Sequence, residues 1–285
     1  MTFLLSSFMQ ANRRACRWVE SLLPAGFRAN LHRRYEPIVS AHIDALSHPV
    51  VIDVGAGRQC PYLKFVGDGR EPYVVGIDSC EEEIRHNQDI SAPIVGDVTA
   101  ALPFAANSVD IITSRSVLEH LKDTASFIGQ CSDTMVDGGI MIHCCPCRFS
   151  PFALINQMVP NRLAKFLLAL FHPEWAEDCG FVAYYNNCWY SRLTNVMKSH
   201  GFEIVAREFR YYQAIYFDFF LPAYVIMLSY DLLIYALGIK NLACQMIIVA
   251  RKLPTRTGSI VSRPVQRAAP VLEAAGGAAR RGTAA

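Results

Sequence analysis

Short apolar runs recur along the chain from residue 49 onward, and segments long enough for helices separate most of them. The first five runs are rich in Val and Ile, which is typical of strands that are covered on both faces. Their alternation with helix-length segments predicts a parallel sheet with a helical layer on each side. The predicted strands are PVVIDVG (49–55), YVVGID (73–78), APIVGD (92–97), VDIITS (109–114), GGIMIHCC (138–145), FEIVAREF (202–209) and CQMIIVARK (244–252).

Three segments between these strands have helical spacing. SCEEEIRHNQ (79–88) and LEHLKDTASFIGQCSDTMV (118–136) are predicted helices, and DGG ends the second of them. YSRLTNVMKSHG (190–201) is predicted to be a third helix. These segments supply the helical layers that the parallel sheet requires.

The first 48 residues form a predicted helical leader. Its apolar positions are expected toward one side of a helix, and they are Phe8, Ala11, Cys16, Trp18, Val19 and Leu22. The leader is also locally basic through Arg13, Arg14, Arg17, Arg28, Arg33 and Arg34. A solvated helix face and a contact with anionic lipid or substrate are both open interpretations of this charge.

Two inserts and a tail lie outside the alternation of strands and helices. The domain at 49–252 contains substrate-side inserts at about 149–187 and 211–239, and the tail at 253–285 has a composition that predicts disorder. The longest uncharged run of the second insert, Phe219–Tyr230, is shorter than the roughly 20 residues that span a bilayer. We therefore expect this insert to roof the substrate site and touch lipid, with a structural lid or a dimer contact as the alternative.

Composition and cysteine usage narrow the class of protein. With 285 residues, 52% of them hydrophobic, the chain can bury the core of one large domain. A net charge of +2 gives no general attraction for nucleic acid, so no nucleic-acid partner is predicted. The ten cysteines are scattered and the N-terminus lacks signal-peptide features, which favours reduced thiols in a cytoplasm. HCCPC (143–147) has no second pair at zinc-ribbon spacing, so a buried strand end is favoured and no metal is expected.

Acids and glycines follow the predicted strands at the positions where parallel sheets bind ligands. Asp53 precedes Gly55 and Gly57 at the first strand end, and the glycines allow close approach of a ligand to the backbone. Asp78 ends the second strand, where a carboxylate can accept hydrogen bonds from both hydroxyls of a ribose, and Asp97 ends the third. These groups predict a nucleoside site. The acid ahead of the loop favours a cationic or amino-acid-bearing ligand over a pyrophosphate.

The ordered motifs VIDVGAG, VVGID, VGDVTAALPFAANSVDIITSRSVLEHL and MVDGGIMIHCCP resemble those of class I S-adenosylmethionine-dependent methyltransferases, in the type 11-like small-molecule group. The resemblance covers about residues 49–146, and the strands near 202–208 and 244–251 resemble the last two of the family. It implies an α/β, Rossmann-like fold with a seven-stranded, mostly parallel sheet, helical inserts and S-adenosyl-L-methionine as cofactor. Gln59 departs from the family pattern, in which many members have a third glycine.

The resemblance also implies roles for individual residues. Asp53 and the glycine loop would surround the methionine part of the cofactor, Asp78 would bind the ribose, and Asp97 with Val98 would face the adenine. Ser114 and Arg115 would line the floor beneath the sulfonium. The full set of implied binding residues is Asp53, Gly55, Ala56, Gly57, Asp78, Ser79, Asp97, Val98, Ser114 and Arg115. An acceptor hydroxyl would benefit from a base, and the candidates are His120 and His143, with packing against the sheet as the alternative role of each. The first insert suits a polar, ring-shaped substrate through His172, Glu177, Asp178, Tyr184 and Tyr185, although aromatic packing explains it equally well.

The sequence therefore predicts an enzyme that transfers a methyl group from S-adenosylmethionine to an oxygen of a glycan or lipid-linked small molecule. The expected location is a bacterial cytoplasm, with peripheral contact to the inner membrane. A quinone or secondary-metabolite methyltransferase is the alternative enzyme, and a non-catalytic, cofactor-binding interaction protein is the alternative from another class. Asp53, Asp78 and Asp97 argue against the last alternative, because a fold that serves only for contacts does not need them.

Overall fold

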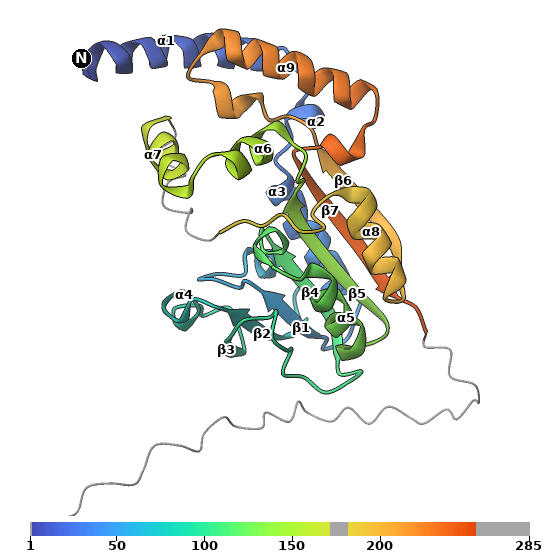
Figure 1. Cartoon of the computed structure of the whole chain (residues 1–285). Coiled ribbons are helices and arrows are strands. Elements are labelled where there is room, and N and C mark those ends of the chain that lie inside the picture. The colour runs from blue at the N-terminus through green and yellow to red at the C-terminus, as the bar shows by residue number, and fades with distance from the viewer. Residues whose placement is uncertain (1, 172–181, 255–285) are drawn as a thin grey trace, which may run out of the picture.

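The centre of the computed structural model, which describes residues 2–171 and 182–254, is a seven-stranded sheet (Figure 1). The strand order is β3-β2-β1-β4-β5-β7-β6, and β7 runs antiparallel to both of its neighbours while the other strands are parallel. This order confirms the predicted mostly parallel α/β fold. The strands are β1 (Val50–Val54), β2 (Tyr73–Asp78), β3 (Ala92–Val95), β4 (Val109–Arg115), β5 (Met135–Pro146), β6 (Phe202–Arg210) and β7 (Gln245–Lys252).

The two faces of the sheet bury different sets of side chains. Alternate residues of a strand point to opposite faces, so Val51 belongs to one buried cluster while Ile52 and Val54 belong to the other. Burial on both faces explains why the central strands are almost continuously apolar. The first face is covered by α3 (Leu31–Asp44) and the 3₁₀ helix η1 (Pro61–Phe65), and the second by α5 (Thr124–Thr134) and α8 (Tyr190–Ser199).

Two of the predicted helices are shorter in the structure. The segment predicted at 118–136 contains a 3₁₀ turn, η2 (Leu118–His120), and then α5, because the Asp123 carboxylate accepts a hydrogen bond from Ser126 N at 2.9 Å and begins a new helix there. Met135 is already part of the sheet, since it pairs with Val109 of β4. The helix predicted at 79–88 is only α4 (Glu81–Arg85).

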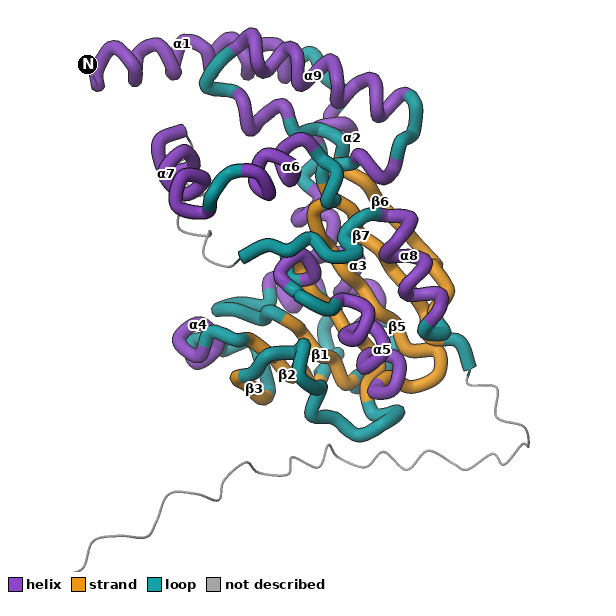
Figure 2. Tube along the Cα trace, viewed as in Figure 1, coloured by secondary structure: helices purple, strands orange, loops and turns teal. Residues whose placement is uncertain are grey.

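A group of helices gathers at the end of the molecule away from β1, β2 and β3 (Figures 1 and 2). α1 lies against α9, where Asn12 Oδ1 accepts a hydrogen bond from Leu221 N at 2.8 Å. The buried carboxylate of Asp231 anchors α9, because its Oδ2 accepts hydrogen bonds from Gln213 N and Ala214 N at 2.7 and 2.8 Å. The helices of this group are α1 (Thr2–Ser21), α2 (Ala25–Arg28), α6 (Pro151–Met158), α7 (Asn161–Phe171) and α9 (Leu221–Ala236).

The leader helix α1 does not bury all of its apolar residues on one side. Cys16 is buried, whereas Phe8 and Trp18 are 52% and 67% exposed, and Leu22, in the turn just after the helix, is 67% exposed. Trp18 lies on the side of α1 that faces away from the contacts of Asn12, Cys16 and Val19 with the rest of the chain. Among the described residues, no helix is long and apolar enough to cross a bilayer.

Candidate functional site

A sharp turn through Gly55, Ala56 and Gly57 follows β1. Both glycines have positive φ angles, +72° and +50°, which other residues rarely adopt. Gly55 N and Ala56 N donate hydrogen bonds to the carbonyl of Ile77 on β2 at 2.7 and 3.3 Å. A Cβ on Gly55 would collide with Val117, in the loop that follows β4. The turn is therefore held closely between the ends of β2 and β4.

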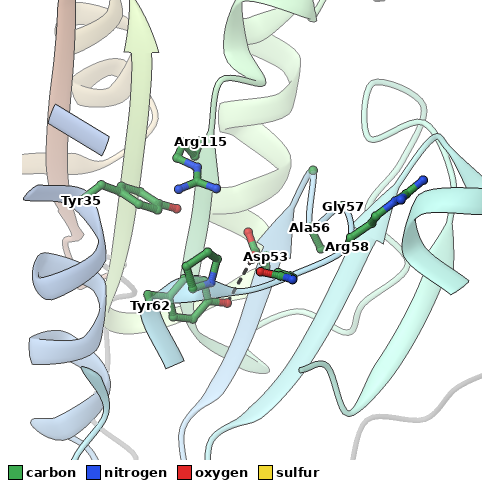
Figure 3. Close-up of a pocket in the computed structure, with 10 residues that line it drawn as sticks. Tyr35, Asp53, Ala56, Gly57, Arg58, Tyr62 and Arg115 are labelled. Carbon is green, nitrogen blue, oxygen red and sulfur yellow. Dashed lines mark hydrogen bonds between the residues drawn. The ribbon is translucent and has the colours of Figure 1, made fainter. Parts of the chain in front are cut away.

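A pocket of about 320 Å³ opens at this turn. It lies at the carboxyl ends of β1 and β4, where open parallel sheets bind ligands. In Figure 3, Asp53 and Arg115 approach the pocket from the sheet, and Tyr35 approaches it from α3. The residues that line the pocket are Tyr35, Asp53, Gly55, Ala56, Gly57, Arg58, Gln59, Pro61, Tyr62 and Arg115.

Asp53 is a buried carboxylate at this pocket and is only 6% exposed. Its Oδ2 accepts hydrogen bonds from Tyr62 Oη at 3.1 Å and from Cys60 Sγ at 3.2 Å. Burial raises the pKa of Asp53 to about 6, although these two hydrogen bonds and the charge of Arg115 act in the opposite direction. A cationic group in the pocket would favour the ionised carboxylate and lower this pKa.

Arg115 supplies a positive charge to the same pocket. Its Nη1 lies 3.3 Å from Glu36 Oε1 of α3, and this partly exposed ion pair joins the end of β4 to the helix above it. The pocket thus contains a carboxylate, Asp53, and a guanidinium, Arg115. Opposite charges at one site are complementary to the ammonium and carboxylate of an amino acid.

Sequence reasoning did not identify Tyr35 or Tyr62 as pocket residues. Tyr35 Oη lies 2.5 Å from Thr113 Oγ1, which fixes the tyrosine over β4. Tyr62 is fully buried and reaches Asp53 from η1, the short element after the glycine turn. The nearness of Tyr62 to the turn in sequence was a usable signal, but no local pattern linked Tyr35 to a strand that begins more than 70 residues later.

Asp78 supports the glycine turn through its side chain. Its Oδ2 accepts a hydrogen bond from Gly57 N at 2.9 Å, and its Oδ1 accepts one from Cys80 N at 2.8 Å. Asp78 is partly exposed and the neighbouring Ser79 is exposed, at the end of β2. Asp78 does not line the pocket itself, but it is bonded directly to a residue that does.

Asp97 and Val98 follow the end of β3, one strand further from the pocket. Gly96 N donates a hydrogen bond to the carbonyl of Asp78 at 2.9 Å, which keeps the ends of β2 and β3 together. Asp97 is exposed, and its Oδ1 accepts hydrogen bonds from Thr99 N and Oγ1 at 2.8 and 2.7 Å, which lower its pKa. Val98 is buried. The predicted cofactor residues therefore follow one edge of the sheet, from β4 across β1 and β2 to β3.

Ser114 and His143 lie on the other face of the sheet from Asp53. Both are fully buried, and Ser114 Oγ lies 2.6 Å from His143 Nδ1. The His143 ring also contacts the ring of Phe127 on α5, with centroids 5.9 Å apart. Burial lowers the pKa of His143 to about 3. The structure thus pairs these two predicted residues with each other and places neither in the pocket lining.

His120 and the two predicted tyrosines do come together, beyond the end of β4. The backbone N–H groups of Tyr184 and Tyr185 donate to the carbonyl of Glu119 at 2.7 and 2.9 Å. His120 Nδ1 lies 3.0 Å from the carbonyl of Val182. Tyr185 is buried and Tyr184 is 37% exposed. The first insert therefore returns to the sheet next to the loop that carries His120.

Glu119 is a buried acid that sequence reasoning missed. It is 5% exposed, and its Oε2 has no hydrogen-bond partner among the described residues. Burial raises the pKa of Glu119 to about 8, so the carboxyl is largely protonated at neutral pH. Its Oε1 lies 3.9 Å from His120 Nε2. The LEH sequence was a signal for the histidine, but nothing local indicated that the glutamate beside it is the more buried residue.

The remaining predicted substrate residues, His172, Glu177 and Asp178, lie outside the described residues. All nine cysteines within the described ranges are free thiols. Cys144, Cys145 and Cys147 of the HCCPC cluster are buried. In the same ranges, no group of three or more His, Cys, Asp or Glu residues could hold a metal ion.

Comparison with known proteins identifies the class to which this fold belongs. Residues 52–143 match a family model described as a methyltransferase domain. The structure is similar to a chain in the complex between the Haloferax volcanii Trm112 methyltransferase activator and a methyltransferase, with a TM-score of 0.50 and 15% identity, over 82% of this chain and 95% of that one. This likeness shows the fold alone.

A curated relative is similar in sequence over a shorter region. The tRNA U34 carboxymethyltransferase of Psychromonas ingrahamii is 31% identical over 159 residues, which are 49% of this chain and 46% of the relative. The matched region therefore spans about half the length of that relative. Together with the family match, the sheet order shows that the chain contains a class I S-adenosylmethionine-dependent methyltransferase domain, as its motifs predicted. S-adenosyl-L-methionine is the cofactor of this domain.

Proposed function

We propose that this protein methylates an oxygen of a glycan or lipid-linked small molecule in a bacterial cytoplasm. The observation that carries the cofactor part of the proposal is the pocket at the glycine turn, which Asp53 and Arg115 face with opposite charges. A dinucleotide would place phosphates beside Asp53 and be repelled, whereas a zwitterionic amino-acid group is attracted by both side chains.

In this proposal the cofactor follows the edge of the sheet. Asp53 holds the ammonium and Arg115 the carboxylate of its methionine part, Asp78 and Ser79 bind the ribose, and Asp97 with Val98 faces the adenine. The open glycine turn fits this assignment, because Gly57 has no other atom within 4 Å of the position that a Cβ would occupy. The bound cofactor supplies a methyl group activated by a sulfonium, and the task of the chain is to align the acceptor with it.

His120 is the proposed base for an acceptor hydroxyl, in preference to His143. Its side chain is 31% exposed and lies next to the returning first insert, where an acceptor could reach it. His143 is fully buried, with its Nδ1 beside Ser114. Glu119, which lies beside His120, is a positioning residue in this scheme, because its protonated carboxyl is buried.

Tyr184 and Tyr185 support an acceptor with a ring, such as a sugar. Tyr185 Oη accepts a hydrogen bond from Asn156 Nδ2 at 3.2 Å, which joins helix α6 to the returning insert, and the neighbouring Tyr184 is 37% exposed. A quinone or secondary metabolite is the alternative acceptor, and a deep apolar binding site in the same place would favour it. An interaction protein without catalysis is the alternative from another class, and failure to turn over any acceptor would favour it.

A tRNA is a second candidate acceptor, and the transferred group would then be a carboxymethyl group. The sequence similarity to a tRNA U34 carboxymethyltransferase favours it. The net charge of +2 argues against a large nucleic-acid surface. An acceptor screen that contains total tRNA beside glycans and lipid-linked sugars separates the two candidates.

The test of the cofactor site is calorimetric titration of the full chain with S-adenosylhomocysteine. Asp78→Ala should weaken binding at least tenfold, since hydrogen bonds to a charged group contribute about 1.5–3 kcal/mol. The matched control is Asp68→Ala, which removes an exposed acid from the loop before β2 and should bind normally. Absence of binding by the unaltered chain, or equal binding by both variants, would overturn the site assignment. The acceptor screen should then include His120→Ala.

A further inference from the structure

The outward side of α9 is a continuous apolar stripe. Its exposed positions are spaced by three and four residues, which places them along one side of a helix. Ile226 and Leu233 are 71% and 57% exposed, although side chains of this kind are usually buried. The exposed residues of the stripe are Pro222, Val225, Ile226, Ser229, Leu232, Leu233 and Ala236, and none of them is charged.

The outward side of α1 is polar and basic, and it carries one large aromatic residue. Trp18 is 67% exposed, as is Leu22 in the turn just after the helix. Arg14 and Arg17 are exposed as well, and helical spacing places Arg14 beside Trp18 and Arg17 next to Arg14. Within the residues that the structure describes, neither arginine forms an ion pair with an acid. An exposed tryptophan beside exposed arginines is typical of helices that lie at a membrane surface.

The apolar stripe of α9 and the side of α1 that carries Trp18 belong to neighbouring helices at the same end of the molecule. α1 and α9 contact each other, and an ion pair between Arg13 and Asp218, with Nε and Oδ1 3.2 Å apart, joins α1 to the segment that enters α9. Their inward sides are buried, through Cys16 on α1 and Tyr224 on α9. Figures 1 and 2 show both helices along the end of the molecule opposite β3.

We propose that the outward sides of α1 and α9, here called the α1–α9 surface, bind the headgroup region of an anionic lipid membrane. The apolar residues would enter the interface, while Arg14 and Arg17 would pair with lipid phosphates. A second copy of the chain fits less well, because an isologous contact through this surface would bring the arginines of both copies near one another. This proposal concerns a surface apart from the cofactor pocket and does not depend on the proposed function.

The test is cosedimentation of the full chain with vesicles of phosphatidylcholine alone or mixed with phosphatidylglycerol. The unaltered chain should bind the mixed vesicles and bind less as salt increases, because charged lipids contribute to the attraction. Ile226→Glu combined with Leu233→Glu should abolish binding. Arg14→Gln combined with Arg17→Gln should weaken it about tenfold or more, since each basic residue near such a surface contributes. Val205→Glu, on the edge strand β6, is the matched control and should bind normally.

Two results would overturn the proposal. One is that the unaltered chain stays in the supernatant with both kinds of vesicle. The other is that the chain forms a dimer without lipid, detected by light scattering, which the Ile226→Glu/Leu233→Glu variant dissociates. Titration with S-adenosylhomocysteine shows whether each variant is folded. The titration also separates this proposal from the proposed function. A variant that loses vesicle binding but binds S-adenosylhomocysteine normally is altered only at the α1–α9 surface.

Discussion

Asp53 is ionised at neutral pH only at a cost, because it is buried beside the glycine turn. Its nearest donors are an uncharged hydroxyl, Tyr62 Oη, and an uncharged thiol, Cys60 Sγ, which stabilise the carboxylate only in part. A bound ammonium would supply the missing positive charge. Among the described residues Asp53 forms no ion pair, which fits its proposed role in binding a cation.

We predict that the affinity for S-adenosylhomocysteine rises with pH as Asp53 ionises. With a pKa of about 6 in the free protein, only a small fraction of Asp53 is ionised at pH 5 and nearly all of it at pH 7.5. Calorimetry should therefore give binding about tenfold weaker at pH 5 than at pH 7.5. Asp53→Asn should bind weakly at both values. A pH-independent affinity in the unaltered chain would show that Asp53 does not contact the ammonium.

Strand alternation explains why two predicted residues lie away from the pocket. Asp53 pairs with Thr113 across β1 and β4, so Thr113 shares its face of the sheet and the next residue, Ser114, lies on the opposite face. His143 is the register partner of Ser114 on β5 and follows it to that face. Motif likeness places a residue at the end of a strand, but only the pairing register decides which face its side chain occupies.

At the scale of elements, the turn after β1 depends on the loop after β4. Gly55 and Gly57 both have positive φ, but only Gly55 faces a close neighbour, Val117. Replacing Gly57 by alanine therefore tests backbone strain alone, whereas replacing Gly55 tests backbone strain together with a collision with Val117.

We predict that Gly55→Ala is more harmful than Gly57→Ala. Gly57→Ala should lower the free energy of unfolding by about 1 kcal/mol, because alanine disfavours positive φ. Gly55→Ala should lower it by about 2–3 kcal/mol and weaken S-adenosylhomocysteine binding, because Val117 must also move. Urea unfolding and calorimetry measure both effects. Equal losses in the two variants would mean that the contact with Val117 has no energetic role.

The elements were predictable to different degrees. The strands lie where the apolar runs placed them, because burial on both faces leaves a strong local pattern. Helices were predicted less well, as the division of 118–136 by the Asp123 cap shows. Insert 211–239 was expected as a roof over the substrate site. In the structure its helix α9 contacts α1 at the end of the molecule away from β1, and its anchor is Asp231.

At the scale of the whole molecule, two buried acids make stability depend on pH. Burial raises the pKa of Glu119 to about 8 and that of Asp231 to about 7. Each of these acids is ionised in the unfolded chain above its ordinary pKa, but it stays protonated in the folded chain up to its raised pKa. Between these two pH values the folded chain binds more protons than the unfolded chain, so stability falls as pH rises. His32 and His143 have lowered pKa values of about 4 and about 3, and they affect stability mainly below pH 6.5.

We predict that the free energy of unfolding falls by about 1 kcal/mol or more between pH 7 and pH 8, chiefly because Glu119 ionises in the folded chain. Glu119→Gln should lose less than half as much over this range. The exposed Glu71→Gln is the control and should follow the unaltered chain. Urea unfolding with a reductant at the two pH values measures the change. If the free energy of unfolding of the Glu119→Gln variant fell as much as that of the unaltered chain, the pH dependence would come from other groups.

The sequence by itself determined the strands and the acids and glycines at their ends, since strand burial and turn formation depend on neighbouring residues. The order of the motifs was also enough to predict the class of the domain and its cofactor. The tertiary structure decided which side chains share the pocket, because Tyr35 reaches it from a helix and Ser114 is turned away by register. It also decided that Glu119 is buried and that the outward sides of α1 and α9 are exposed. Burial is a property of the assembled chain, since segments far apart in the sequence cover or expose each residue.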